Sequence, residues 1–201
     1  MLRLKDLSKS YDGKDIIKDL SLTFPESGFI ALCGPSGCGK STLLHMIAGL
    51  IPKDSGEIIF NKKSPVVSIS FQEPRLLPER TAAQNVNFVL GDKKATLKRS
   101  EELLSELGIK DHVLYPDELS GGMKARVAIA RALAIEADVY LFDEPFANLD
   151  SETAWEVARV IKQHTGRALV IAVIHDEKFA ESIAHKVIRF DRSPLSVADI
   201  T

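Results

Sequence analysis

Gly34-Pro35-Ser36-Gly37-Cys38-Gly39-Lys40-Ser41 is the stretch that decides the fold of this 201-residue chain. It fits the pattern G-x-x-x-x-G-K-[ST] at every fixed position. An apolar run precedes it at residues 29–33, and a helical pattern follows it at residues 42–48. A strand, a loop and a helix in that order are the setting in which this pattern marks a phosphate-binding loop. The alternative is a glycine-rich turn that happens to contain a lysine, and the flanking segments argue against it.

The backbone and two side chains of this loop suit a nucleoside triphosphate. Glycines let successive N–H groups turn toward a polyphosphate, and the N-terminus of the following helix adds partial positive charge. Lys40 places a charge on the β- and γ-phosphates, and the Ser41 hydroxyl can ligate Mg²⁺. We therefore predict that the chain binds a nucleoside triphosphate. The expected binding residues are Gly34, Pro35, Ser36, Gly37, Cys38, Gly39, Lys40, Ser41 and Thr42.

Composition and charge are those of an ordinary globular protein, with 45% hydrophobic and 27% charged residues. The net charge of −2 gives no electrostatic argument for nucleic acid or an anionic membrane surface. No apolar run approaches the roughly 18 to 20 residues that a membrane-spanning helix needs. The N-terminus lacks the apolar stretch of a signal peptide. Cys33 and Cys38 suggest neither a disulfide framework nor a metal site, and they suit a reducing cytosol.

Residues 1–28 alternate short apolar segments with turn signals, which predicts a small, half-exposed antiparallel sheet. Leu2 and Leu4 alternate with charged residues, and Asp12-Gly13 is a turn. Tyr11 stands at the tip of this first connection. Two interpretations of Tyr11 are open: an aromatic ring that covers the sheet edge, or a face on which an adenine stacks.

The middle of the chain changes from strand patterns to a helical one. Residues 56–60 and 66–71 are apolar enough for strands, and Gln72 ends the second. From about residue 81 to 108 the pattern is helical, with Leu97, Leu104 and Leu107 on one face. We predict one domain over residues 1–201, with a core of residues 1–72 and 120–201. Residues 73–119 are the predicted inserted helical subdomain, whose charges form a solvated face.

Ser120, Gly121 and Gly122 precede a segment of mostly small apolar residues. We expect this segment to form a buried helix. A serine and glycines at the start of a helix make a second anion-binding position.

Residues 139–142 are an apolar strand that ends in Asp143 and Glu144. A buried strand that delivers carboxylates at its C-terminal end is typical of P-loop NTPases. Asp143 would hold Mg²⁺, directly or through water, and Glu144 would face the attacking water. The alternative is a pair that caps the next helix, but Pro145 and the loop up to Asp150 intervene.

Asp150 begins a further helix, and residues 168–174 are the most apolar run of the chain, which predicts a central strand. His175 ends that strand as a turn residue or, beside a phosphate site, as a sensor of the γ-phosphate. Residues 186–190 are the last strand that the pattern predicts. Strands that alternate with helices indicate an α/β fold with a mainly parallel sheet and its ligand along the carboxyl edge.

From Leu2 to about Phe190 the chain resembles the nucleotide-binding subunits of ABC transporters. The phosphate loop alone indicates only a P-loop NTPase. The specific match is Leu119-Ser120-Gly121-Gly122, which has the family's signature sequence and lies between Gln72 and the acidic strand. Asn148-Leu149-Asp150 matches the family's D-loop, and His175 matches its switch histidine.

The resemblance implies ATP as the nucleotide and a homodimer with ATP at its interface. Each ATP would lie between the phosphate loop of one subunit and the signature residues of the other. It implies catalytic roles for Glu144, the general base, and for His175, Gln72 and Lys40. The further residues implied are Tyr11 on the adenine, Ser120, Gly121, Gly122 and Asp150 on nucleotide, and Ser41, Gln72 and Asp143 on Mg²⁺.

The same resemblance implies partners and a location. The partners are transmembrane permease subunits, which Gln72 would link to the site, a second ATP-binding subunit and a solute-binding protein. The chain would lie in the cytoplasm, peripheral on the cytoplasmic face of the cell membrane.

The segments around residues 71–78 and 143–146 resemble importer ATPases for nitrate, sulfonates, taurine and related small solutes. Three features depart from that subgroup. Glu79-Arg80 stands where a tryptophan is usual, and Lys124-Ala125-Arg126 lacks the common glutamine. The connection at residues 56–72 is also compact, and we expect no C-terminal regulatory extension. We expect a small-solute importer and leave the solute open.

Two other classes fit less well. An ABC ATPase acting on DNA or ribosomes would show a long coiled coil or two tandem cassettes and a basic surface, so we expect no nucleic-acid partner. A P-loop kinase would have a lid and a second substrate site, and it has no use for the Ser120-Gly121-Gly122 element.

Overall fold

The computed structural model describes residues 1–191 and 193–201, in which two sheets and six α-helices form. The larger sheet has the strand order β5-β6-β7-β3-β8-β9. The first five strands are parallel to one another, as predicted. Their bounds are β3 (Gly28–Cys33), β5 (Val67–Ser70), β6 (Val139–Asp143), β7 (Leu169–Val173) and β8 (Lys186–Phe190).

The sixth strand, β9 (Val197–Ile200), corrects the expectation that β8 is the last strand. It pairs antiparallel with β8 at the edge of the sheet. Three of its four residues are exposed, so it lacks the apolar pattern of the buried strands.

The smaller sheet is antiparallel, as predicted for residues 1–28, and a later strand, β4, joins it in the order β2-β1-β4. Its strands are β1 (Leu2–Tyr11), β2 (Lys14–Phe24) and β4 (Ser55–Phe60). Asp12 and Gly13 join β1 to β2, both with positive φ. That conformation is the one a two-residue hairpin turn requires. The hairpin carries Tyr11 at its tip.

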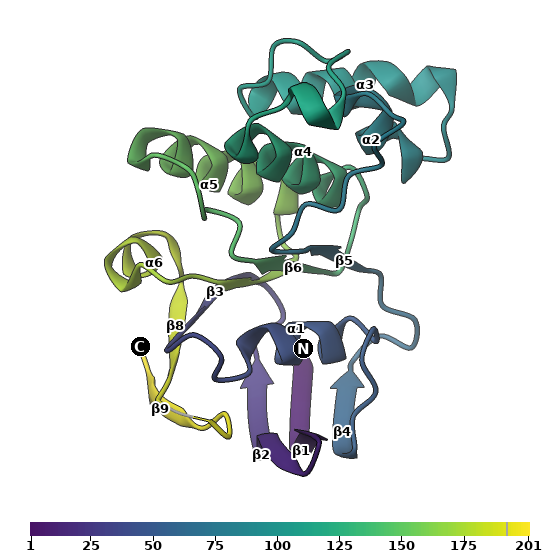
Figure 1. Ribbon diagram of the computed structural model, residues 1–201. Coiled ribbons are helices and arrows are strands. Elements are labelled where there is room, and N and C mark those ends of the chain that lie inside the picture. Colours follow the sequence, from purple (N-terminus) through teal and green to yellow (C-terminus); the bar gives the residue numbers. More distant parts are fainter. Residues whose placement is uncertain (192) are drawn as a thin grey trace.

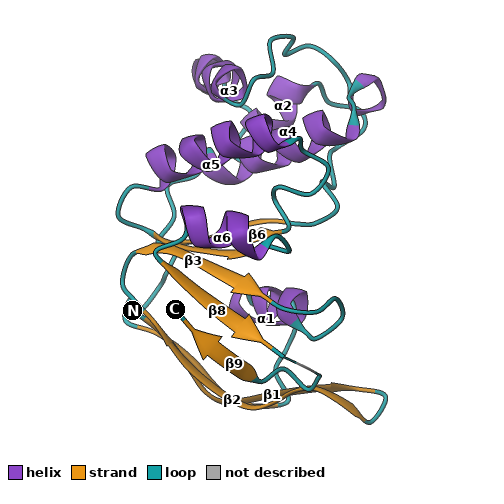
Figure 2. Ribbon diagram, turned by 90° about the vertical axis from the view of Figure 1, so that its left-hand side faces the viewer, coloured by secondary structure: helices purple, strands orange, loops and turns teal. Residues whose placement is uncertain are grey.

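Alternation along the parallel strands builds two cores, one on each face of the large sheet. Figures 1 and 2 show that helices lie on both faces of this sheet. In β3, Phe29, Ala31 and Cys33 face one core, and Ile30 and Leu32 face the other. Helix α1 (Lys40–Ile47) lies between the two sheets (Figure 1). Helices α4 (Gly121–Leu133), α5 (Ser151–Thr165) and α6 (Glu177–Ile183) cover the opposite face of the large sheet.

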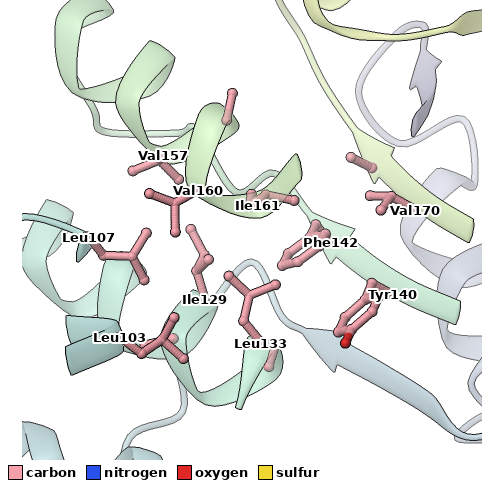
Figure 3. Close-up of a cluster of buried hydrophobic side chains, with 14 of the residues drawn as sticks. Leu103, Leu107, Ile129, Leu133, Tyr140, Phe142, Val157, Val160, Ile161 and Val170 are labelled. Atoms are coloured by element: carbon pink, nitrogen blue, oxygen red, sulfur yellow. The ribbon is translucent and has the colours of Figure 1, made fainter. Parts of the chain in front are cut away.

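The helical pattern between residues 81 and 108 forms two helices rather than one. They are α2 (Ala82–Phe88) and α3 (Lys94–Glu106), separated by Gly91 and Asp92, which both have positive φ. A 3₁₀ turn, η1 (Pro116–Glu118), follows. Figure 3 shows Leu103 of α3, and Leu107 directly after that helix, directed toward Ile129 of α4 and the side chains of α5.

Helix α4 therefore packs against α3 on one side and against the large sheet on the other. The division at residues 73–119 stays a prediction, because the core that α2 and α3 share with α4 crosses it. Within the described residues, no helix is both long and apolar enough to cross a membrane.

Candidate active site

A cavity of about 340 Å³ opens at the carboxyl ends of the parallel strands. The phosphate loop follows β3, Gln72 follows β5, Glu144 follows β6 and His175 follows β7. Because parallel strands end at the same edge of a sheet, residues far apart in the chain meet there. The lining consists of Tyr11, Ile16, Ser36, Gly37, Gly39, Lys40, Ser41, Thr42, Gln72, Glu144 and His175.

Two glycines of the loop have steric reasons to be glycine. A Cβ on Gly34 would lie 2.4 Å from the carbonyl oxygen of Phe190, and Gly34 has a φ of +143°. Gly39, the residue before α1, has a φ of +115°, and its Cβ would approach Ile16. These positions let the backbone turn inward at the start of α1, as a phosphate cradle requires.

Lys40 is almost fully buried at the floor of the cavity. Its ammonium donates to the carbonyl oxygens of Gly34 (2.8 Å) and Pro35 (2.7 Å) and lies 3.6 Å from Cys38 Sγ. The loop thus points its one lysine into the cavity and holds it with its own carbonyls.

Ser41 and Asp143 are joined beneath the cavity. The Ser41 hydroxyl donates to Asp143 Oδ1 at 2.9 Å, and Asp143 is 3% exposed. Burial raises the pKa of Asp143 above its ordinary value, and the hydrogen bond from Ser41 opposes that rise. A buried carboxylate of this kind gains most from a cation nearby.

This donor set fits Mg²⁺. The described residues hold no cluster of three or more His, Cys, Asp or Glu side chains arranged to bind a metal. Mg²⁺ on a nucleotide needs only one or two protein oxygens, since phosphates and waters supply the rest. The Ser41 hydroxyl and the Asp143 carboxylate are such oxygens. Gln72 lines the same cavity and is exposed.

Glu144 and His175 face each other across the ends of neighbouring strands. Glu144 Oε1 lies 2.7 Å from His175 Nε2, and both residues line the cavity. Glu144 has a φ of +52°, a left-handed conformation that costs energy for a residue with a side chain. Such conformations cluster at functional sites. Glu144 in this conformation lines the same cavity as Ser36, Gly37 and Lys40 of the phosphate loop.

Tyr11 lines the cavity from the β1–β2 hairpin, with 44% of its surface exposed. Lys9 Nζ lies 5.2 Å from its ring centroid. The ring is therefore partly exposed at the mouth of the cavity, with the Lys9 ammonium over it. This placement favours the adenine-stacking interpretation over simple cover of the sheet edge.

The remaining predicted residues lie outside this cavity but beside one another. Ser120 caps α4 by accepting from the N–H of Met123. A Cβ on Gly122 would lie 3.2 Å from the carbonyl oxygen of Asn148, so the signature and D-loop segments touch. Gly121 is exposed, with open space where a Cβ would stand.

Asp150 caps α5, as predicted. Its carboxylate accepts from the N–H of Thr153 at 2.9 Å and from the Thr153 hydroxyl at 2.8 Å. These bonds lower the pKa of Asp150. Neither Asp150 nor Ser120 lines the cavity beside the phosphate loop of its own chain.

Sequence reasoning missed two residues near the site. Ile16 lines the cavity, and its signal was the pair Ile16-Ile17, of which Ile17 is fully buried in the core while Ile16 is only partly buried against it. His45 lies behind the cavity, with Nε2 3.8 Å from Asp143 Oδ2. A polar residue one turn after Ser41, on a helix with buried apolar neighbours, was the available signal for His45.

Another hollow, of about 490 Å³, lies at the opposite edge of the large sheet, where β6 and β7 begin. Its lining mixes exposed acids and bases, among them Glu136, Asp138 and Lys62. Lys62 and Asp138 already pair with each other at 2.9 Å. The predicted site residues Lys40, Glu144 and His175 lie instead at the carboxyl edge of the sheet.

Comparisons with known proteins show the family of the chain. The family model described as ABC transporter matches residues 17–147. The arginine transport ATP-binding protein ArtM of Bacillus subtilis is 37% identical, over 96% of this chain and 88% of its own. The aliphatic sulfonates import ATP-binding protein SsuB 3 of Rhodococcus jostii is 36% identical, over 96% of this chain and 72% of its own.

Solved structures are similar over the whole chain. The dimeric bacterial ABC transporter cassette MJ0796 has a TM-score of 0.90 at 29% identity, covering 100% of this chain and 98% of that one. A dimeric post-hydrolysis state of the same cassette, bound to ADP and Pi, has a TM-score of 0.87 at 27% identity, covering 99% of each chain. With its phosphate loop, signature segment and acidic strand in one fold, the chain belongs to the ABC transporter family of ATP-binding proteins.

Proposed function

We propose that this chain binds and hydrolyses ATP as the nucleotide-binding subunit of an ABC importer, and that ATP-driven closure of two such subunits powers a separate permease. The observation that carries the proposal is the cavity in which Lys40, Glu144 and His175 meet. It joins a phosphate-binding loop to a carboxylate beside a histidine. A phosphate-binding group and a general base are what the transfer of a phosphoryl group to water requires.

Each residue has a defined part in the hydrolysis. Lys40 and the loop amides bind the β- and γ-phosphates, and Tyr11 stacks on the adenine. Glu144 accepts a proton from the water that attacks the γ-phosphorus, while the bond to the bridging oxygen of ADP breaks. His175 orients Glu144 and contacts the γ-phosphate.

Mg²⁺ would be held by Ser41 and Asp143. Gln72, which lines the same cavity, would also contact the ion. The ion, when bound, neutralises charge that develops on the phosphates. Asp143 keeps one oxygen on the Ser41 hydroxyl, so the two protein oxygens act together.

The second subunit supplies the residues that the first lacks at its own cavity. Ser120, Gly122 and Asp150 lie outside the cavity of their own chain. They suit the ATP of a partner copy, since the start of α4 is a helix N-terminus. The dimeric state of both structural relatives supports this arrangement.

The solute stays unassigned. The relatives' names cover arginine, L-cystine, lactose, aliphatic sulfonates and spermidine/putrescine, which share only small size. We propose a small-solute importer with a transmembrane permease and a solute-binding protein as partners. The chain would lie on the cytoplasmic face of the membrane. None of these relatives is named for nucleic acid or ribosomes, so that alternative has no support.

Two measurements test the proposal. The purified chain should bind MgATP and release phosphate, and Lys40→Ala should weaken ATP binding by about 10- to 100-fold, since a charge-assisted contact is lost. Lys162→Ala, which removes an exposed lysine of α5, is the control. The chain, isolated from native membranes, should bring permease subunits with it that mass spectrometry identifies. Unchanged ATP affinity in Lys40→Ala, or nucleic acid as the only co-purifying partner, contradicts it.

A further inference from the structure

A buried ring nitrogen without a partner lies behind the active site. His45 Nε2 is the one buried side-chain nitrogen or oxygen, among the described residues, that makes no hydrogen bond. An acceptor stands close by: Asp143 Oδ2 lies 3.8 Å away. That separation is longer than a hydrogen bond, so the ring and the carboxylate must move toward each other for the contact to form. Leaving a buried polar atom unpaired is unfavourable, so the contact is favoured to form.

His45 and Ser41 approach the same carboxylate from one face of α1. They are four residues apart, so their side chains stand one above the other on the helix. The Ser41 hydroxyl donates to Oδ1 of Asp143 at 2.9 Å, whereas His45 faces Oδ2. Each oxygen of Asp143 therefore has its own neighbour on α1, Ser41 at Oδ1 and His45 at Oδ2.

The His45 ring is held in place from its other side. It packs against Phe71 with a centroid distance of 5.5 Å and an interplanar angle of 59°. The Arg75 guanidinium lies 4.2 Å from the Phe71 centroid. The Arg131 guanidinium donates to the carbonyl oxygen of Arg75 at 2.9 Å. Phe71 directly precedes Gln72, so His45 stands between the carboxylate and the loop that carries Gln72.

A simple packing role explains less. The neighbouring α1 residues Leu44, Met46 and Ile47 are buried and apolar, and another apolar side chain at position 45 would avoid the unpaired nitrogen. His45 does not line the nucleotide cavity, so it does not serve by touching the nucleotide. The atom it faces is the free oxygen of Asp143.

We propose that His45 is a positioning residue for Asp143. Its Nε2–H donates to Oδ2 while the Ser41 hydroxyl donates to Oδ1, and the carboxylate is thereby fixed in one orientation for Mg²⁺. The proposal rests on the proposed function, because it concerns the same site. Residues that orient metal-binding groups in this way typically change metal affinity or activity by about 10- to 100-fold when replaced.

The test compares ATP binding by calorimetry with Mg²⁺ and with EDTA. His45→Phe keeps a ring against Phe71 but removes the donor, and His45→Gln places an amide N–H at a similar reach. The dissociation constant for ATP in EDTA, divided by that with Mg²⁺, measures how much Mg²⁺ strengthens binding. This ratio should fall about 10-fold in His45→Phe and return to near the wild-type ratio in His45→Gln. Affinity in EDTA should stay unchanged in both. Met46→Leu, a packing change on the same helix, is the control, and His45→Leu replaces His45→Phe if that variant does not fold.

An unchanged ratio in the donor-free variant overturns the proposal, as does an equal loss of affinity with and without Mg²⁺. A loss that His45→Gln fails to restore also overturns it. The wild-type protein gives the separate result on the proposed function. If Mg²⁺ does not strengthen ATP binding in wild type, the proposed function itself fails, whereas failure of His45 alone leaves it standing.

Discussion

Glu144 Oε1 and His175 Nε2 lie 2.7 Å apart, although they follow two different strands. β6 and β7 are parallel neighbours, with Asp143 paired to Val173 at their ends. The sheet thus sets the carboxylate and the imidazole side by side, and both face the phosphate loop across the cavity.

His175→Ala removes the imidazole that lies against Glu144, which we propose orients its carboxylate. We expect the hydrolysis rate to fall by about 100-fold, the lower end of what a well-placed general base contributes. ATP affinity should change little, because Lys40 and the loop amides are untouched. Steady-state phosphate release and calorimetry separate the two effects. Wild-type turnover in His175→Ala would show that the pair is structural.

The segment 71–78 and the neighbouring helices should form the docking surface for a permease helix. Leu76 packs against the core, while Arg75 and Glu79 are exposed. Cysteines placed at Arg75 or Glu79 should cross-link to a membrane subunit, and a cysteine at Glu57, on β4 in the small sheet, should not. The chain's own two cysteines are buried, so the placed one is the reactive thiol. Cross-links confined to this chain would favour a hinge role for the segment.

The sequence predicted the parts of the site that depend on short patterns. The phosphate loop and the strand that ends in Asp143 and Glu144 each carry their own local signal. His175 was indicated by its place at the end of the apolar run 168–174, whereas Gln72 followed from the resemblance to the ABC transporter family. The α/β fold with a mainly parallel sheet followed from the same alternation of strands and helices.

Features that depend on distant packing were out of reach. β9 has three exposed residues and forms by pairing with β8, so the sequence carries no apolar pattern that predicts it. The position of His45 against Asp143 depends on how α1 lies over β6. The left-handed conformation of Glu144, which no propensity suggests, depends on the turn that leaves the sheet.

Asp54 should contribute acid-sensitive stability to the hairpin that carries Tyr11. Its carboxylate accepts from Lys9 Nζ and from the N–H and hydroxyl of Ser10. These contacts lower the pKa of Asp54 from 3.8 to about 2. A lowered folded-state pKa means that the contribution is full above the unfolded value. It is lost as pH falls from about 4 toward 2.

Asp54→Asn removes that titration. Between pH 5 and pH 2 the unfolding free energy of wild type should fall more steeply than that of Asp54→Asn, with the two curves closest at the acid end. Urea titrations at each pH measure this. Parallel curves would mean that Asp54 titrates normally in the folded chain.

Ser120 should act on the nucleotide of the partner subunit. Ser120→Asn and Ser120→Asp both keep an oxygen that can cap α4, so each preserves the helix start. Only Ser120→Asp places a negative charge toward the γ-phosphate, so in the Glu144→Gln background it alone should prevent the ATP-dependent dimers that light scattering measures. Monomer ATP binding should remain in both variants. Equal dimerisation of the two variants would show that Ser120 does not contact the nucleotide of the partner subunit.

The central claim is that ATP closes two copies of this chain around a site where Glu144 is the base. Glu144→Gln keeps the shape and removes the base, so hydrolysis should slow by about 10² to 10⁴ while ATP still binds. Bound ATP should then hold the dimer. Size-exclusion chromatography with light scattering should show the mass rising from 22.1 kDa to twice that value with MgATP and remaining at 22.1 kDa with EDTA and no nucleotide. A Glu144→Gln variant that binds MgATP and stays monomeric, or that hydrolyses it at the wild-type rate, would contradict the account.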